Sequence, residues 1–145
     1  MALVSVHGFS EIDAMFQKLG DVPWDVTRQA LDQMAEVGEN AVRRTGRAMN
    51  VLDPTTPENI LDRVTHTKPK QTEDGGKTAV TFSGSRTRGN TETRNAEIAF
   101  LNEYGTDHQE ARPFIRQTAE QYGDEISAPG AQLVGDWMEQ TFTEG

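Results

Sequence analysis

The chain has 145 residues, 34% of them hydrophobic, no cysteine, and a net charge of −9. A chain of this length fits one domain with a modest core, and the lack of cysteine excludes disulfides and thiolate chemistry. The acidic balance argues against general nucleic-acid binding, because affinity for phosphates comes from clustered Lys and Arg.

Two helices are predicted in the first 49 residues. Ser10 and Asp13 resemble a capping box, and a short helix follows it to about Gly20. A long amphipathic helix then runs from Pro23 to about Met49, because apolar residues recur every three or four positions. That apolar stripe consists of Val26, Ala30, Met34, Val37 and Ala41.

The middle of the chain has the composition of strands. Residues 50–59 contain two prolines and read as a linker of turns. Residues 60–67 and 77–83 are rich in β-branched side chains, and the polar segment 68–76 joins them. They are predicted to pair as a β-hairpin with a long loop.

Residues 84–95 contain no apolar side chain, so we expect a mobile loop without packed structure. Residues 96–104 fit either a third strand or a helix, since partial alternation coincides with good helix-forming residues. A helix is predicted to begin at Pro113, with Phe114, Thr118, Tyr122 and Ile126 along one side. Pro129 should kink or break it.

These elements predict one α+β domain over residues 1–145. A small, mainly antiparallel sheet should carry a long N-terminal helix and a C-terminal helix packed on it. No apolar run approaches the roughly 20 residues that cross a bilayer, and no secretory signal is visible at the start. We therefore expect a chain that stays in solution and folds in the cytoplasm.

Catalytic signatures are missing from the sequence. It has no phosphate-binding glycine loop, no nucleophile elbow and no zinc-protease helix. Asp107, His108 and Glu110 lie together, but in one loop without a second ligand cluster, so a solvated turn is the preferred reading over a metal site. The sequence thus predicts no enzyme, metal or cofactor, with a small hydrolase kept as a minor alternative.

The charge is distributed unevenly along the chain. Residues 1–42 carry −5, residues 43–94 carry +4 and residues 95–145 carry −8. The basic middle includes Arg86, Arg88 and Arg94, so a small nucleic-acid-binding module that uses the 86–94 loop is the leading alternative function.

The stretch AFLNEYGTDHQEARPFIR, residues 99–116, reads as a rigid corner before a helix. Gly105 can take a positive φ, and Thr106 or Asp107 can hydrogen-bond within the turn. Tyr104, Pro113 and Phe114 are predicted to hold the fold together, with Phe114 as a core anchor. The sequence leaves two roles open for Glu103 and Arg112: they pair with each other across the turn, or they contact a neighbouring subunit.

The two motifs AFLNEYGT and ARPFIR, in this order before a helix, resemble the gene-product-ten family of long-tailed bacteriophages. Members of that family are small neck and tail-completion proteins of the virion. The resemblance is strong over residues 96–122. The loop 84–95 is longer and more polar than the family pattern, and the tail after Pro129 has no matching motif.

The resemblance implies a non-enzymatic virion protein, made in the host cytoplasm, that completes the tail and joins it to the head. It implies a ring of copies, a hexamer first and a twelve-fold ring second, through which DNA passes without specific binding. Its partners would be a head-closure or adaptor protein and a tail terminator or tail tube protein, with no membrane. In a closed ring, a surface patch of each copy contacts a different patch of the next copy. Contacts between the acidic ends of one copy and the basic middle of the next would suit this arrangement.

Overall fold

The computed structural model describes residues 4–5, 22–51 and 59–143. Its main helices are α2 (Trp24–Ala48), α3 (Asn95–Tyr104) and α4 (Phe114–Thr143). The helix predicted over residues 10–20 and most of the predicted 50–59 linker lie outside the described residues. The predicted α+β class, with a long N-terminal and a C-terminal helix, is confirmed.

Three small antiparallel sheets accompany the helices. The first has the order β1-β5-β2, with β1 at Val4–Ser5, β5 at Ala79–Phe82 and β2 at Val64–His66. Strand β2 pairs with β5 from Val64↔Phe82 to His66↔Val80, which confirms the predicted pairing of segments 60–67 and 77–83. The first four residues of segment 60–67 form the 3-10 helix η2 (Ile60–Arg63) instead of strand, capped by Asn59.

The connection between β2 and β5 is more ordered than its polar composition indicated. It folds into a two-stranded hairpin of β3 (Lys70–Thr72) and β4 (Gly75–Lys77). This hairpin packs against the first half of α2, where a Cβ at Gly76 would lie 2.7 Å from the Trp24 ring and 2.9 Å from Leu31. Glycine therefore permits the close approach of strand and helix.

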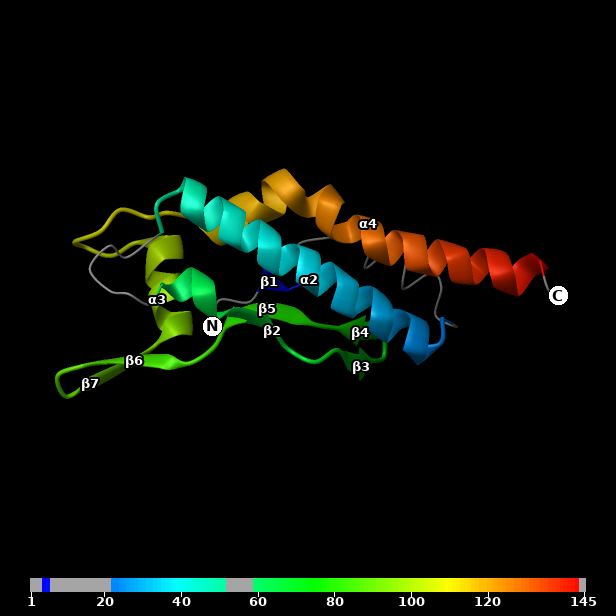
Figure 1. The fold of residues 1–145 in the computed structure, drawn as a ribbon, viewed down its shortest axis with the longest axis horizontal. Coiled ribbons are helices and arrows are strands. Elements are labelled where there is room, and N and C mark those ends of the chain that lie inside the picture. Colours follow the sequence, from blue (N-terminus) through cyan, green and yellow to red (C-terminus); the bar gives the residue numbers. More distant parts are fainter. Residues whose placement is uncertain (1–3, 6–21, 52–58, 144–145) are drawn as a thin grey trace.

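Helix α2 lies between α4 and the strands (Figure 1). It is buried along two sides for this reason, and the buried set extends beyond the predicted stripe. Ala30, Met34 and Ala41 pack toward α4, whereas Val42 joins the core formed with the sheet. A Cβ at Gly130 of α4 would lie 2.5 Å from the sulfur of Met34, so the two helices cross at close range.

Two clusters of buried apolar side chains form the core. One lies among β2, β5, η2, α3 and the start of α4, and it contains Phe82 and Phe114, whose rings meet edge to face at 5.9 Å. The other joins α2 to the middle of α4 through Met34, Ile126 and Val134. Helix α4 thus belongs to both clusters, which ties the sheet end to the helical end.

The prediction of an unstructured loop at residues 84–95 is wrong. Segment 84–95 contains a β-hairpin of β6 (Ser85–Arg88) and β7 (Thr91–Arg94) where we expected an unstructured loop. The signal was Gly89-Asn90 between runs containing Thr, because Gly89 has φ 61°, as the first central residue of a type II′ turn requires. At Pro129 the sequence predicted a kink or a break, and helix α4 continues through this residue without a break.

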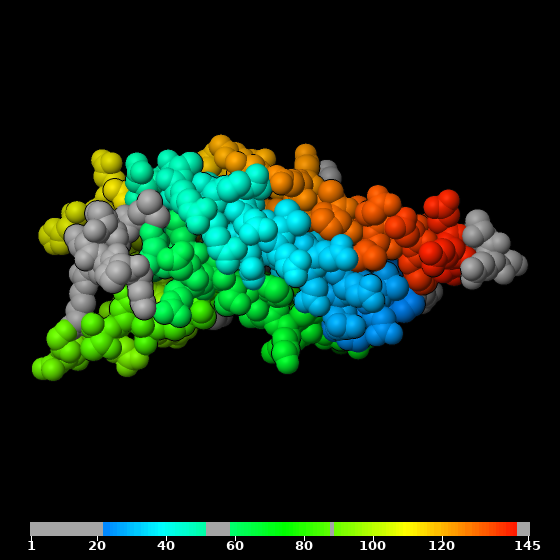
Figure 2. All heavy atoms as spheres, viewed as in Figure 1, coloured from blue at the N-terminus to red at the C-terminus, as the bar shows by residue number. Residues whose placement is uncertain are grey.

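Segment 96–104 is the helix α3, which settles the open choice between strand and helix. The hairpin β6–β7 projects from the body beside α3, at the end of the molecule opposite the C-terminal part of α4 (Figure 1). Figure 2 shows the same elongated outline in space-filling form, with α2 and α4 side by side along its length. None of the described helices is apolar enough over a sufficient length to cross a membrane.

Candidate functional site

The corner between α3 and α4 begins at Gly105, where the chain reverses. Gly105 has φ 75°, a left-handed conformation that favours glycine, and this confirms the prediction. A Cβ there would also lie 2.7 Å from the backbone nitrogen of Ala111 and 2.9 Å from the carbonyl oxygen of Gln109. Both the backbone conformation and the lack of space therefore require glycine at this position.

A small turn follows Gly105 and is held by its own backbone. The amide of Thr106 donates to the carbonyl oxygen of Gln109 at 2.8 Å, and the Thr106 hydroxyl oxygen accepts from the His108 amide at 3.2 Å. Thr106 or Asp107 was predicted to hydrogen-bond within the turn, and Thr106 does so. This arrangement brings the chain back toward α3 before α4 begins.

Glu103 is a buried capping residue. Its side chain is at the inner side of α3, and the residue is only 5% exposed. Its two carboxylate oxygens accept hydrogen bonds from the amides of Ile115 at 2.8 Å and Arg116 at 3.1 Å. The carboxylate thus satisfies free donors at the positive end of the α4 dipole, where negative charge is favourable.

Arg112 does not pair with Glu103 in the described part of the chain. Its guanidinium donates instead to the carbonyl oxygen of Asn50 at 2.8 Å, just after the end of α2. Its backbone amide donates to the carbonyl oxygen of Asn102 at 2.6 Å. Of the two roles left open for Glu103 and Arg112, the pair across the turn is not formed, since each side chain bonds to backbone groups. The burial of Glu103 also contradicts its use as a contact with a neighbouring subunit.

Pro113 and Phe114 begin α4 as predicted. The Pro113 carbonyl accepts from the Gln117 amide at 2.9 Å, which opens the helix. Phe114 is 0% exposed and lies in the sheet-side core, so its role as an anchor is confirmed. Glu103 and Phe114 together fix the start of α4 against α3 and the sheet.

Two asparagines that the sequence reasoning missed organise this region. Asn102 accepts the Gln109 amide group at 3.2 Å, and its own amide donates to the Ile98 carbonyl at 2.9 Å. Asn95 is 3% exposed, donates to the Ser83 carbonyl at 2.8 Å and accepts from Arg86 Nε at 3.2 Å. For Asn95 the signal in the sequence was its residue type at the junction of strand and helix, because the short side-chain amide of asparagine bonds readily to nearby backbone groups.

Arg86 and Arg94 lie on opposite faces of the β6–β7 hairpin. Arg94 is paired in register with Ser85, and Arg86 with Thr93, so these two successive pairs point to opposite faces of the hairpin. The backbone of Arg88 pairs with Thr91 at the hairpin end. Arg86 is also held by Asn95, whereas Arg94 is exposed. Arg86 and Arg94 therefore do not form a single basic stripe that would follow a phosphate backbone.

Tyr104 lies at the surface, contrary to the prediction that it supports the core. It is 62% exposed, and its ring lies 4.7 Å from that of Phe100, which is 43% exposed. Leu101 beside them is 42% exposed. In the described part of the chain, all the large hydrophobic side chains that are strongly exposed belong to α3.

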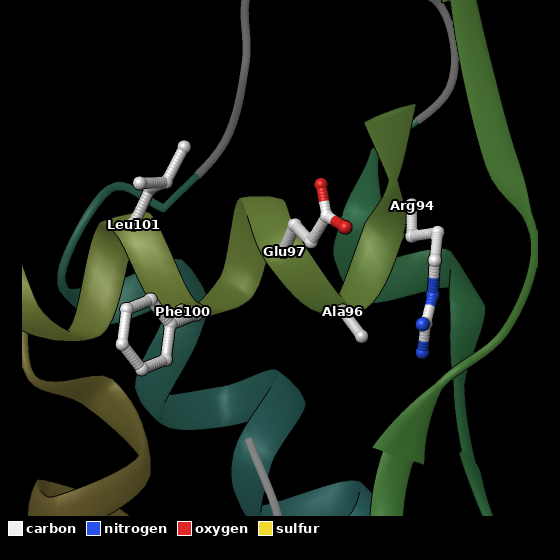
Figure 3. A pocket seen from close by; sticks show the side chains of 5 residues that line it. All are labelled: Arg94, Ala96, Glu97, Phe100 and Leu101. Atoms are coloured by element: carbon white, nitrogen blue, oxygen red, sulfur yellow. The ribbon is translucent and has the colours of Figure 1, made fainter. Parts of the chain in front are cut away.

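A pocket of about 380 Å³ lies along α3, next to these side chains. It is lined by Arg94, Ala96, Glu97, Phe100 and Leu101. Figure 3 shows Phe100 and Arg94 directed to one side of α3, and Leu101 and Glu97 directed to the other. An apolar centre with a cation and an anion at its edges is typical of a protein-binding surface.

A second polar cluster links β2 to α2. His66 Nδ1 lies 2.6 Å from Glu39 and its Nε2 lies 3.6 Å from Asp32, while Arg43 lies 3.8 Å from Glu39. The two carboxylates thus flank opposite nitrogens of one ring, which joins strand to helix. In the residues described, no group of three or more His, Asp or Glu side chains could hold a metal ion.

Comparison with models of protein families, with curated proteins and with solved structures finds no match to this chain.

Proposed function

We propose that this chain is a non-enzymatic structural subunit of a long-tailed bacteriophage virion. In this proposal it forms part of the head–tail neck as a tail-completion ring, with DNA passing through the lumen without specific binding. Its neighbours are a head-closure or adaptor protein on one side and a tail terminator or tail tube protein on the other. The proposal starts from the resemblance of residues 96–122 to the gene-product-ten family.

The observation that carries it is the contact between the two motifs. Glu103 of the first motif accepts from the amides of Ile115 and Arg116, which belong to the second. Gly105 makes the reversal between them, and Phe114 fixes the helix that follows. The motifs thus have a physical reason to occur together, which supports their reading as one structural unit.

The placement of Arg86 and Arg94 on opposite faces of the hairpin also favours this function over the nucleic-acid-binding alternative. A ring through which DNA slides should not hold phosphates tightly, because counterion release by a basic lining would slow its passage. The net charge of −9 suits a ring through which DNA slides, because like charges do not hold the phosphates.

The ring can be tested on the purified chain. Native mass measurement and electron microscopy of negatively stained particles should show a closed oligomer, and an antibody against the chain should label the neck of phage particles. A chain that remains monomeric at high concentration, or labelling of the capsid or tail tip, would refute the proposal. DNA retention that weakens steeply with salt would favour the nucleic-acid-binding alternative instead.

A further inference from the structure

The outer side of α3 differs from the rest of the described surface. Tyr104 is at i+4 from Phe100 and at i+3 from Leu101, so it lies beside both, and the three exposed side chains form an apolar surface around Tyr104. Single exposed hydrophobic residues are ordinary on protein surfaces, but a cluster on one short helix marks a contact region. We call these three residues the α3 face.

Charge at the edge of the α3 face indicates what it binds. Arg94 precedes the helix, is exposed, and has no ion-pair partner among the residues that the structure describes. The α3 face has the cation of Arg94 at its N-terminal edge and the exposed carboxylate of Glu97 along its length. The cation fits a surface that offers small side chains and, at the matching end, a carboxylate.

The outer side of α4 is such a surface. Its exposed residues at helical spacing are Glu120, Asp124, Ala128, Ala131 and Gly135. A Cβ at Gly135 would meet no atom within 4 Å, so this side of the helix is open. The side chains of Glu120 and Asp124 have no partner among the described residues, whereas the neighbouring Glu125 is paired with Arg44 at 3.0 Å.

The two surfaces have the same order of residue types. On the α3 side the charged residue comes first and the apolar residues follow; on α4 the carboxylates come first and the small residues follow. From Arg94 to Leu101 and from Asp124 to Ala131 there are seven positions each, or about 10 Å along a helix. A parallel arrangement therefore places Arg94 at Asp124 and Leu101 at Ala131, so the α3 face lies over Ala131 and Gly135.

We propose that the α3 face of one copy of this chain docks on the outer side of α4 of a second copy, with Arg94 paired to Asp124. The contact joins unlike patches, as a closed ring requires, and it rests on the proposed function. Small side chains on α4 let the aromatic residues of α3 approach the helix backbone closely. The pair Arg94–Asp124 fixes the register.

The absence of native cysteine allows a direct test by disulfide formation. One preparation carries Leu101→Cys and another carries Ala131→Cys, both at exposed positions. When they are mixed and oxidised, we expect a cross-linked dimer between the two variants. In the matched control, the second preparation carries Gln29→Cys, at an exposed position of α2, in place of Ala131→Cys. The yield of its cross-linked dimer should be at least about tenfold lower.

A charge exchange tests the register. In the cross-linking pair, Arg94→Asp on the Leu101→Cys chain should lower the yield about tenfold, as loss of a close charge pair does. Adding Asp124→Arg to the Ala131→Cys chain should restore it. Restoration cannot arise from damage to the fold, because it needs two substitutions on different chains.

Three outcomes would overturn the inference. One is equal cross-linking to residues 29 and 131, and another is a disulfide that forms mainly between two Leu101→Cys chains, which indicates a two-fold contact. The third is that the unmodified chain forms oligomers, whereas the Leu101→Cys and Ala131→Cys variants form no disulfide with each other. That last result leaves the proposed ring standing with a different interface, whereas an unmodified chain that never assembles refutes the ring itself.

Discussion

The two sides of α3 differ in a way that reverses the usual pattern. Its inner side buries Ala96, Ala99 and the carboxylate of Glu103, while its outer side exposes two aromatic rings and a leucine. The small residues permit close packing against the core, and the buried carboxylate has two backbone donors to receive it. The inner side therefore holds the fold, and the outer side is available for another molecule.

The same reversal explains why the helix was hard to recognise from sequence. A helix that packs on a core normally shows its large apolar residues at the inner positions. Here the side chains of greatest hydrophobic area point outward, so the pattern of residues 96–104 fits a strand as well as a helix. Substitutions that affect one side of α3 and leave the other intact can separate the two roles.

The largest expected effect is the loss of the inner anchor. Phe114→Ala should lower the free energy of unfolding by about 3–5 kcal/mol, the usual cost of deleting a buried aromatic ring. Phe100→Ala removes the same ring from the outer side and should cost about 1 kcal/mol or less. Chemical denaturation of both variants measures this difference, and equal losses would show that the outer side belongs to the core.

Gly105→Ala should have the next largest effect. The positive φ alone costs on the order of 1–3 kcal/mol for a residue with a Cβ, and contact with the backbone at Ala111 adds to this. Gly135→Ala is the matched control, because its Cβ would meet nothing and alanine favours a helix by about 1 kcal/mol. Thermal melting should move the two variants in opposite directions; a neutral Gly105→Ala would contradict the described corner.

Glu103→Ala should destabilise the fold by about 0.5–2 kcal/mol, since it removes the side chain that caps α4. Glu97→Ala, at an exposed position of the same helix, should stay within about 0.5 kcal/mol. Urea unfolding of the two variants provides the comparison. Similar stabilities for both would mean that the capping bonds of Glu103 contribute little.

The smallest effect on stability is expected from the outer side. Tyr104→Ser should change the free energy of unfolding by about 0.5 kcal/mol or less, yet it should weaken self-association by at least about tenfold. Sedimentation over a range of concentrations, together with melting, separates these effects. A variant that melts much earlier but associates normally would reverse the roles assigned to the two sides of α3.

The sequence predicted the parts of the fold that depend on local pattern. The period of three to four residues identified α2, and the β-branched runs identified the pairing of β2 with β5. Gly105 and Phe114 were also predicted, because positive φ and aromatic burial are strong constraints on residue type. These features can be predicted without knowing which residues lie nearby in the fold.

The errors involved residues whose partners are distant or polar. Glu103 and Arg112 are close in sequence and opposite in charge, but each bonds to backbone groups that only the fold brings near. The β6–β7 hairpin was missed because its strands carry no apolar side chain, although its turn signal was present. At Pro129, α4 continues despite the proline because its packing on α2 on both sides stabilises the helix.

The central claim is that the inner side of α3 holds the fold while the outer side binds a second copy. Hydroxyl-radical labelling of the unmodified chain, measured residue by residue at low and high concentration, tests it most directly. Phe114 should remain protected at every concentration, whereas Phe100 and Tyr104 should be labelled in the dilute chain and become protected as oligomers form. Equal labelling of Phe100 and Tyr104 in monomer and oligomer would contradict the claim.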